Sequence, residues 1–449
     1  MAKKLSIMDS GWLMMETRET PMHVGGLALF ALPEDAPSDY MESVYRYLVE
    51  VDGICRPFNQ KIQSHLPLHM DAAWVEDRNF DIDYHVRHSA LPRPGRVREL
   101  LALVSRLHAQ RLDPSRPLWE SYLIEGLEGN RFALYTKMHH SMVDGVAGMY
   151  LMQSRMATSA DERLPAPWSG EWDANKPAKA KATRAKAGAM DGLGNVRKAT
   201  GQLVDLLRQP KDSNVKTIYR APKTLLNRRV TGARRFAAQS WSLSRIKEAG
   251  RRHGGTVNDI FLAMCGGALR RYLLTQDALP DAPLVAQVPV ALRSADQAAE
   301  GGNAITMVQV SLGTHLADPQ ERLAAIQDSM MSVKKRLGVM QKAEIDVYTV
   351  LTNAPLSLGQ ITGLSGRVSP MFNLVISNVP GPKQSLYLNG AEMLASYPVS
   401  LVLHGYALNI TVVSYKDSLE FGVIGCRDTL PHIQRFLDYF EASLAELEG

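Results

Sequence analysis

Short apolar segments with strand-like alternation and longer amphipathic segments follow one another along the first 160 residues. The alternation is found at Gly25–Phe30 and Phe132–Met138, whereas Tyr40–Val51 and Val97–Leu112 have the spacing of helices. A mixture of this kind is typical of an α/β layered domain.

The same mixture returns after Phe236 and continues to the C-terminal end of the chain. The predicted helices are Ser244–Arg252, Thr256–Leu274 and Pro319–Leu337, and the predicted strands are Leu284–Val290, Thr306–Leu312, Phe372–Ser377, Ala407–Tyr415 and Leu419–Gly425. A chain of 449 residues is also long enough for two domains. We therefore expect an α/β fold with an N-terminal domain over 1–160, a linker over 161–235 and a C-terminal domain over 236–449.

The stretch between the two expected domains has a different character. It contains Pro165, Pro167 and Pro177, little apolar density, and 16 Lys and Arg against 5 Asp and Glu from Glu171 to Arg235. Within it, Val196–Leu207 has apolar residues near helical spacing. This segment is either a helix packed across the two domains or a basic amphipathic helix at a lipid surface.

Composition and targeting signals point to the cytoplasm. Three scattered cysteines form no C-x-x-C pair, and the apolar stretch from Leu5 to Met15 is interrupted at Asp9 and is followed by no signal-peptide cleavage site. No apolar run approaches the roughly 20 residues that span a bilayer. We expect a cytoplasmic protein that can also associate peripherally with the inner membrane or a lipid body.

The strongest candidate for chemistry is the motif His139-His140-x-x-x-Asp144-Gly145, which follows the strand Phe132–Met138 and precedes a predicted helix, Val146–Arg155. A histidine at the end of a strand, before a tight turn, can project into a cleft. Because its unperturbed pKa is near 6.5, a neutral histidine there can act as a general base.

Other interpretations of the motif fit less well. Adjacent histidines on a strand face opposite sides, so they cannot both ligate one metal ion. No G-x-S-x-G elbow of a serine hydrolase is present. A single histidine is most often a hydrogen-bonded residue of the core. Core packing explains a tandem pair with Asp-Gly at fixed spacing less well. We therefore predict no metal site.

The motif resembles that of the coenzyme A-dependent acyltransferase superfamily, and the chain as a whole resembles the bacterial wax ester synthase/acyl-CoA:diacylglycerol acyltransferase family. Several further segments carry this resemblance in the same order along the chain. These segments are Met8-Asp9, Pro21-Met22-His23-Val24-Gly25, Phe80–Val86, Pro117-Leu118-Trp119-Glu120, Val257–Ala263, Val288–Arg293, Gly302-Asn303 and Ser377–Pro382.

The resemblance implies a division of roles. His140 would be the general base, and His139 would be structural. Asp144 would hold the loop geometry, with Arg293 as its candidate partner, and Gly145 would permit the turn. The implied fold is a pair of chloramphenicol-acetyltransferase-like domains with the active-site channel at their interface. Acyl-CoA would be a co-substrate, and no cofactor is expected.

Three further residues are candidates in the second half. The resemblance places Asn258 by the active site, where its amide could stabilise a developing oxyanion. Asp259 is a candidate for substrate binding, but Thr256-x-x-Asp259 also resembles a capping box that would make it structural. Ser377 either lies in a turn or lines the acyl channel.

Trp119 of the Pro117-Leu118-Trp119 segment is expected to be buried near the catalytic strand.

The activity implied is transfer of a long-chain fatty acyl group from acyl-CoA to a long-chain alcohol, to diacylglycerol, or to both. The products would be wax ester, triacylglycerol or both, and no nucleic acid partner is expected. Two alternatives remain open. One is a condensation-type enzyme that uses carrier-bound acyl donors, and the other is a non-enzymatic protein that binds lipid droplets.

Overall fold

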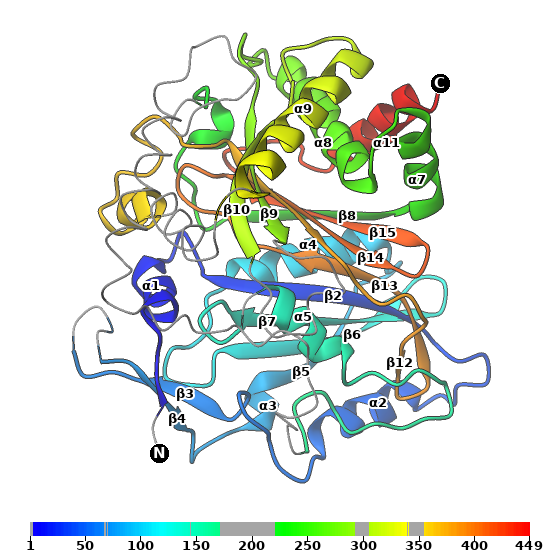
Figure 1. The fold of residues 1–449 in the computed structure, drawn as a ribbon. Coiled ribbons are helices and arrows are strands. Elements are labelled where there is room, and N and C mark those ends of the chain that lie inside the picture. The colour runs from blue at the N-terminus through cyan, green and yellow to red at the C-terminus, as the bar shows by residue number, and fades with distance from the viewer. Residues whose placement is uncertain are drawn as a thin grey trace.

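Two six-stranded sheets, each covered by helices, make up most of the molecule (Figure 1). The computed structural model describes residues 3–66, 69, 71–143, 145–170, 221–291, 305–338, 340 and 354–449. The predicted helix at Val196–Leu207 lies outside these residues.

The first sheet has the strand order β12-β13-β2-β7-β6-β5. Its central strand β7 runs antiparallel to both neighbours, β2 and β6, and only β5 is parallel to its partner. The strands are β12 (Tyr387–Leu388), β13 (Ala391–Val399), β2 (His23–Ala31), β7 (Arg131–His139), β6 (Trp119–Leu127) and β5 (Val86–Ala90).

Alternating side chains of β7 are buried on both faces of this sheet. Phe132 and Leu134 belong to a core cluster with residues of α2 (Tyr40–Val49) and α5 (Gly145–Gln153). Tyr135 points to the other face and packs with residues of α4 (Val97–Ala109) and with Phe236 of the second sheet. Because successive side chains of a strand point to opposite faces, one strand contributes to both cores.

The second sheet has the order β10-β9-β11-β14-β15-β8, and four helices lie over one of its faces (Figure 1). Most side chains of the helix α8 are buried. Gly266 lets this helix approach the backbone just after β10, since a Cβ at this position would lie 2.6 Å from the Leu312 carbonyl oxygen. The strands are β8 (Arg234–Ser242), β9 (Val285–Ala291), β10 (Ile305–Ser311), β11 (Leu374–Val379), β14 (Leu408–Tyr415) and β15 (Ser418–Cys426), and the helices are α7 (Leu243–Arg252), α8 (Val257–Thr275), α9 (Pro319–Gly338) and α11 (Arg435–Glu448).

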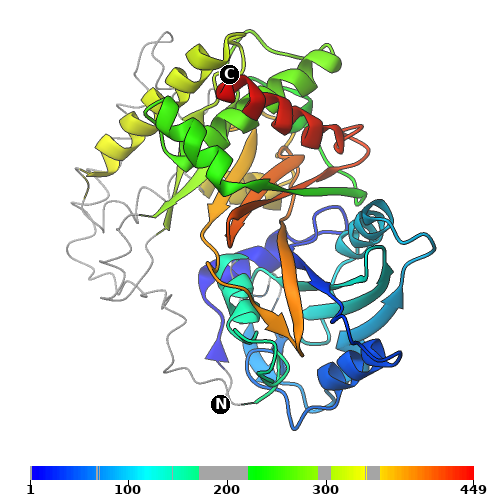
Figure 2. The same cartoon turned by 90° about the vertical axis from the view of Figure 1, so that its right-hand side faces the viewer.

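Two strands from the C-terminal half, β13 and β12, complete the N-terminal sheet. β13 pairs with the open edge of β2, from Met393 opposite Phe30 to Val399 opposite Gly25. Figure 2 shows this orange strand beside the blue and cyan ones. The sheet therefore takes its strands from both expected domains, because pairing with β13 satisfies backbone groups that β2 would otherwise leave unpaired.

The secondary structure predicted from the sequence is confirmed for the named helices and strands in the described residues, with ends that shift by at most three residues. β13 was not among the predicted strands. The remaining elements are β1 (Lys3–Lys4), β3 (Gln60–Gln63) and β4 (Ala73–Glu76) in a small sheet, α1 (Ile7–Met15), α3 (Ile82–His85) and a 3-10 turn at Leu225–Asn227. No helix among the described residues has the length and apolar character to cross a membrane.

Candidate active site

The two motif histidines lie at the end of the central strand β7, and both neighbouring strands extend their hydrogen bonding to this point. The backbone N–H of His139 donates to the Leu118 carbonyl at 2.9 Å, and the N–H of His140 donates to the Met22 carbonyl at 2.8 Å. The segments that precede β6 and β2 therefore fix the backbone of the histidine pair from both sides.

His139 is fully buried and is held as a neutral ring. The backbone N–H of Ser141 donates to its Nδ1 at 3.1 Å, and the Ser141 hydroxyl lies 2.7 Å from the same nitrogen. Since a backbone N–H can only donate, Nδ1 is the acceptor and the ring proton resides on Nε2. Desolvation, together with a smaller contribution from the neighbouring His140, lowers the pKa of His139 to about 3.

Glu16, which the sequence analysis did not single out, supports this arrangement. One carboxylate oxygen accepts from the Met22 N–H at 3.1 Å, and the other accepts from the Arg111 guanidinium at 2.8 Å. The first oxygen also lies 3.8 Å from Nε2 of His139. This carboxylate therefore connects the end of α1 with the start of β2 and with the histidine motif. The only sequence feature that could have indicated Glu16 is its position five residues before Pro21-Met22, a segment that carries the family resemblance.

A second residue that sequence reasoning missed is Trp12 on α1. Its indole is stacked on the imidazole of His140, with ring centroids 4.0 Å apart and an interplanar angle of 21°. His140 is only partly buried, unlike His139. Nothing in the local sequence indicates this contact, because 128 positions separate the two residues and only the fold brings them together.

The motif continues into a turn and then a helix. The N–H of Met142 donates to the His139 carbonyl at 2.9 Å, and α5 begins at Gly145. Asp144 and Arg293 lie outside the described residues, so the expected pairing between them stays a prediction.

Two of the candidates in the second half, Asn258 and Asp259, lie at the start of α8. Thr256 caps this helix, and the carboxylate of Asp259 accepts from the N–H and the hydroxyl of Thr256, both at 2.8 Å. The predicted capping box is therefore confirmed, and the Asp259 side chain is buried in that structural role. Asn258 stands one position earlier, partly exposed, in the first turn of the helix.

Asn378 on β11, and not its predicted neighbour Ser377, contacts Asn258. The Asn378 amide donates to the Asn258 side-chain oxygen at 3.5 Å. Because side chains alternate along a strand, Ser377 points to the opposite face of β11. Asn378 is therefore a further candidate, within a segment that the sequence analysis had already marked.

One hydrogen bond connects the helix after the histidine motif with the loop that follows Asn378. The hydroxyl of Tyr150, on the helix that follows the histidine motif, donates to the Pro380 carbonyl at 2.7 Å, two residues beyond Asn378. The helix after the motif and the loop after β11 are thus in direct contact. Tyr150 therefore links α5, which follows the histidine motif, to the loop that follows Asn378.

Two remaining expectations concern packing and metals. Trp119 is fully buried beside β7, opposite Met138, and its indole N–H donates to the Phe58 carbonyl at 2.8 Å, so its predicted packing role is confirmed. Within the described part of the chain, no three His, Cys, Asp or Glu residues converge as metal ligands would.

Comparison with known proteins gives a consistent result. Residues 5–261 match the model of the wax ester synthase/diacylglycerol acyltransferase catalytic domain, and residues 301–448 match that of the C-terminal domain of the same family. A putative diacylglycerol O-acyltransferase of Mycobacterium tuberculosis is 45% identical over 447 residues, covering 99% of each chain.

Solved structures agree. A wax ester synthase/diacylglycerol acyltransferase from Marinobacter aquaeolei VT8 superposes with a TM-score of 0.81 at 42% identity, over 99% of this chain and 98% of that one. The starter condensation domain of rhizomide synthetase has a TM-score of 0.58 at 13% identity, over 100% and 95% of the two chains, and supports the fold alone. The expected pair of chloramphenicol-acetyltransferase-like α/β domains is confirmed. The chain belongs to the wax ester synthase/diacylglycerol acyltransferase family, and it is an acyltransferase.

Proposed function

We propose that this protein transfers a long-chain fatty acyl group from acyl-CoA to a long-chain alcohol, to diacylglycerol, or to both, with His140 as the general base. Family membership supports the reaction class. The single observation that carries the base assignment is the different state of the two histidines. His139 is buried and used in internal contacts, whereas His140 is partly exposed and stacked on Trp12.

The proposed reaction is a direct transfer. Neutral His140 takes the hydroxyl proton of the alcohol while the alcohol oxygen forms a bond to the thioester carbonyl carbon. The tetrahedral intermediate then collapses with cleavage of the C–S bond, and the protonated imidazole returns its proton to the coenzyme A thiolate. No acyl-enzyme forms, and the reaction needs no cofactor.

The neighbouring residues have supporting roles in this proposal. The Asn258 amide stabilises the developing oxyanion, and Asn378 orients that amide through their contact. Trp12 stabilises the imidazole when it becomes a cation, since the face of an indole attracts positive charge. Asp144 and Arg293 maintain the loop, and the substrates meet in a channel between the two domains.

The substrates also suggest where the enzyme works. Long-chain alcohols and diacylglycerol reside in membranes and lipid bodies, while acyl-CoA is dissolved in water. We therefore propose a cytoplasmic enzyme that associates peripherally with the inner membrane or a lipid-body surface and has no nucleic acid partner.

The test is thiol release from palmitoyl-CoA by the purified protein, with hexadecanol or dioleoylglycerol offered in parallel and the ester product identified. His140→Ala should lower turnover by about 10²–10⁴, the usual contribution of a positioned base. His65→Ala, at an exposed histidine, is the matched control and should keep wild-type turnover.

The alternatives give different results. Wild-type turnover in His140→Ala would refute the base assignment. No release with either acceptor, combined with transfer from an acylated carrier protein, would favour a condensation-type enzyme. Binding to lipid without transfer from any donor would favour a non-enzymatic lipid-binding protein.

A further inference from the structure

An unusual group of exposed apolar side chains lies in the helix over 354–361 and in the turns that follow it. Leu358, Ile361, Leu364 and Val368 are 60%, 42%, 49% and 54% exposed, and they make up half of the large hydrophobic side chains that are exposed in the described part of the chain. We call these four residues the 358–368 patch. Scattered exposed apolar residues are ordinary, but four within eleven positions mark an interaction surface.

The backbone beneath the 358–368 patch is well anchored, so the exposure is not a result of loose packing. The buried side chain of Gln360 donates to the His404 carbonyl at 2.7 Å, and the N–H of Ser365 donates to the Gly359 carbonyl at 3.0 Å. The Arg229 guanidinium donates to the Gly363 carbonyl at 3.1 Å. The contacts with His404 and Arg229 hold the segment in place while its apolar side chains stay exposed.

The charge around the patch is positive. Arg367 is exposed within it, and Lys223 is exposed beside it, since the Lys223 ammonium donates to the Arg367 carbonyl at 3.4 Å. The sequence contains no Asp or Glu from 347 to 391. The nearby carboxylate of Glu19 is already paired, at 3.2 Å from His404 and 3.8 Å from Arg229.

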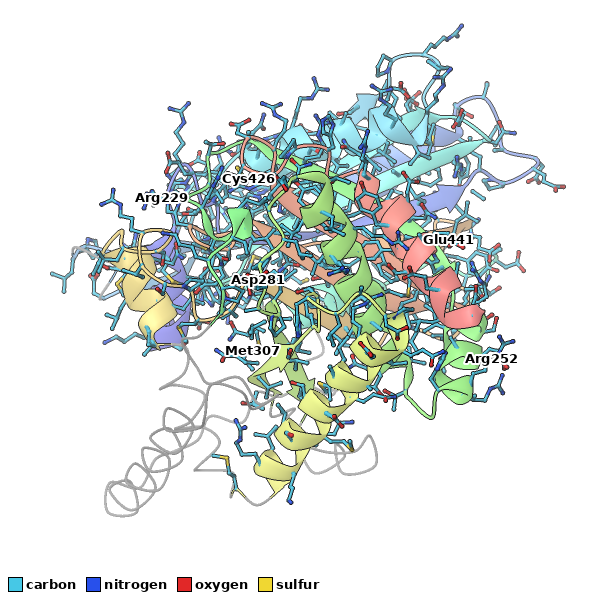
Figure 3. The ribbon with its side chains drawn as sticks, turned by 90° about the horizontal axis from the view of Figure 1, so that it is seen from above. Arg229, Arg252, Asp281, Met307, Cys426 and Glu441 are labelled. Atoms are coloured by element: carbon cyan, nitrogen blue, oxygen red, sulfur yellow. The ribbon has the colours of Figure 1, made fainter. Side chains whose placement is uncertain are left out.

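The 358–368 patch lies on the same side of the molecule as α1, the helix that carries Trp12. Figures 1 and 3 both show the helix over 354–361 beside α1, and Figure 3 labels Arg229 close to the two helices. Trp12 of α1 is stacked on His140, and Glu19, the partner of Arg229, follows α1 in the chain. A surface that covers the patch would therefore also lie close to α1.

We infer that the 358–368 patch docks this enzyme on an anionic phospholipid surface. The apolar side chains insert among the acyl chains, and Arg367 and Lys223 contact lipid phosphates. An acidic protein partner would match the charge of Arg367 and Lys223 but would not need four large exposed apolar side chains beside them. The further step, that docking delivers the alcohol or diacylglycerol to α1 and His140, rests on the proposed function.

Binding is tested with sucrose-loaded vesicles of phosphatidylcholine alone or with 30% phosphatidylglycerol. The full-length protein should sediment with the anionic vesicles. The variant L358S/I361S/L364S/V368S should lose at least about tenfold in partition coefficient, because four partly exposed side chains no longer insert. Lys223→Gln with Arg367→Gln should lose about tenfold at low salt only, since exposed charges are screened at high salt.

Matched variants control for general loss of surface hydrophobicity or charge. The apolar control replaces Leu66, Leu274, Met331 and Leu394, which are 55%, 53%, 61% and 43% exposed elsewhere on the molecule, with serine. The charge control replaces the exposed Lys334 and Lys335 on α9 with glutamine. Both controls should bind as the wild type does. Equal binding by the patch variant and the wild type, or no binding by the wild type, would overturn the inference.

Activity separates this inference from the proposed function. With hexadecanol in detergent micelles, the patch variant should turn over as the wild type does, whereas with hexadecanol in anionic vesicles it should be slower by about the same factor as its binding. If the wild type is inactive in micelles, the proposed function fails, and the vesicle sedimentation still decides the role of the patch.

Discussion

Replacing Trp12 with leucine tests whether the ring stacked on His140 contributes to catalysis. The two ring centroids are 4.0 Å apart at an angle of 21°, so the indole presents its face to the imidazole. In the proposed mechanism, His140 starts as a neutral imidazole and carries a positive charge once it has taken the proton. The interaction with the indole should therefore strengthen toward the transition state, and its loss should lower kcat more than it raises KM.

The magnitude follows from the geometry. A cation over an indole at a partly desolvated site is stabilised by about 1–2 kcal/mol, which corresponds to a roughly 5- to 30-fold loss of kcat. Trp12→Phe retains a smaller ring and should lose less. Tyr45→Leu is the matched control, since it removes another stacked ring pair, in which Tyr45 lies 5.3 Å from His88 at the same angle of 21°.

The assay is thiol release at saturating hexadecanol over a range of palmitoyl-CoA concentrations, with thermal melting to confirm that each variant is folded. Unchanged kcat in Trp12→Leu would mean that the indole does not stabilise the protonated imidazole. A rise in KM with unchanged kcat would instead make Trp12 a contact for the substrate and not a support for the base.

Three further predictions concern the surroundings of the histidines. Glu16→Gln should lower kcat about tenfold by loosening the loop that holds His139, and Arg111→Met should lose a similar amount without adding to it in the double variant, because both break one ion pair. Lys137→Met should lower the free energy of unfolding by about 3–5 kcal/mol in urea titration, because the buried carboxylate of Glu120 would lose its nearer cation and two backbone carbonyls would lose a donor. Burial lowers the pKa of His108 and of His139 to about 3, below the ordinary 6.5, so their contribution to stability is complete above pH 6.5 and declines as the pH falls toward 3. Each should remove about 2 kcal/mol from the free energy of unfolding between pH 7 and 5, and urea midpoints that do not change with pH would contradict this.

Much of the local structure and the centre of the site could be predicted from the sequence. The alternation over Phe132–Met138 predicted β7, and the motif after it indicated a histidine at the end of a strand. The capping box at Thr256 and Asp259 was likewise predictable, because a cap depends on residues three positions apart. Features of this kind are encoded by neighbours in the chain.

Contacts between distant segments could not be predicted in this way. Trp12 reaches His140, and β13 reaches β2, only after the whole chain has folded. No periodicity in β13 specifies which edge it will join, since the choice depends on where an unpaired strand remains. The preference for Asn378 over Ser377 beside Asn258 likewise depends on which face of β11 meets α8.

The α/β class, most of the helices and strands, the family and the pair of histidines follow from the sequence alone, because each of these depends on local pattern or on residues in a fixed order. Only the folded chain shows which histidine is buried and neutral, which ring is stacked on the other, and where apolar residues stay on the surface. Those features depend on desolvation and on contacts between segments far apart in the chain, which arise only when the two sheets pack together.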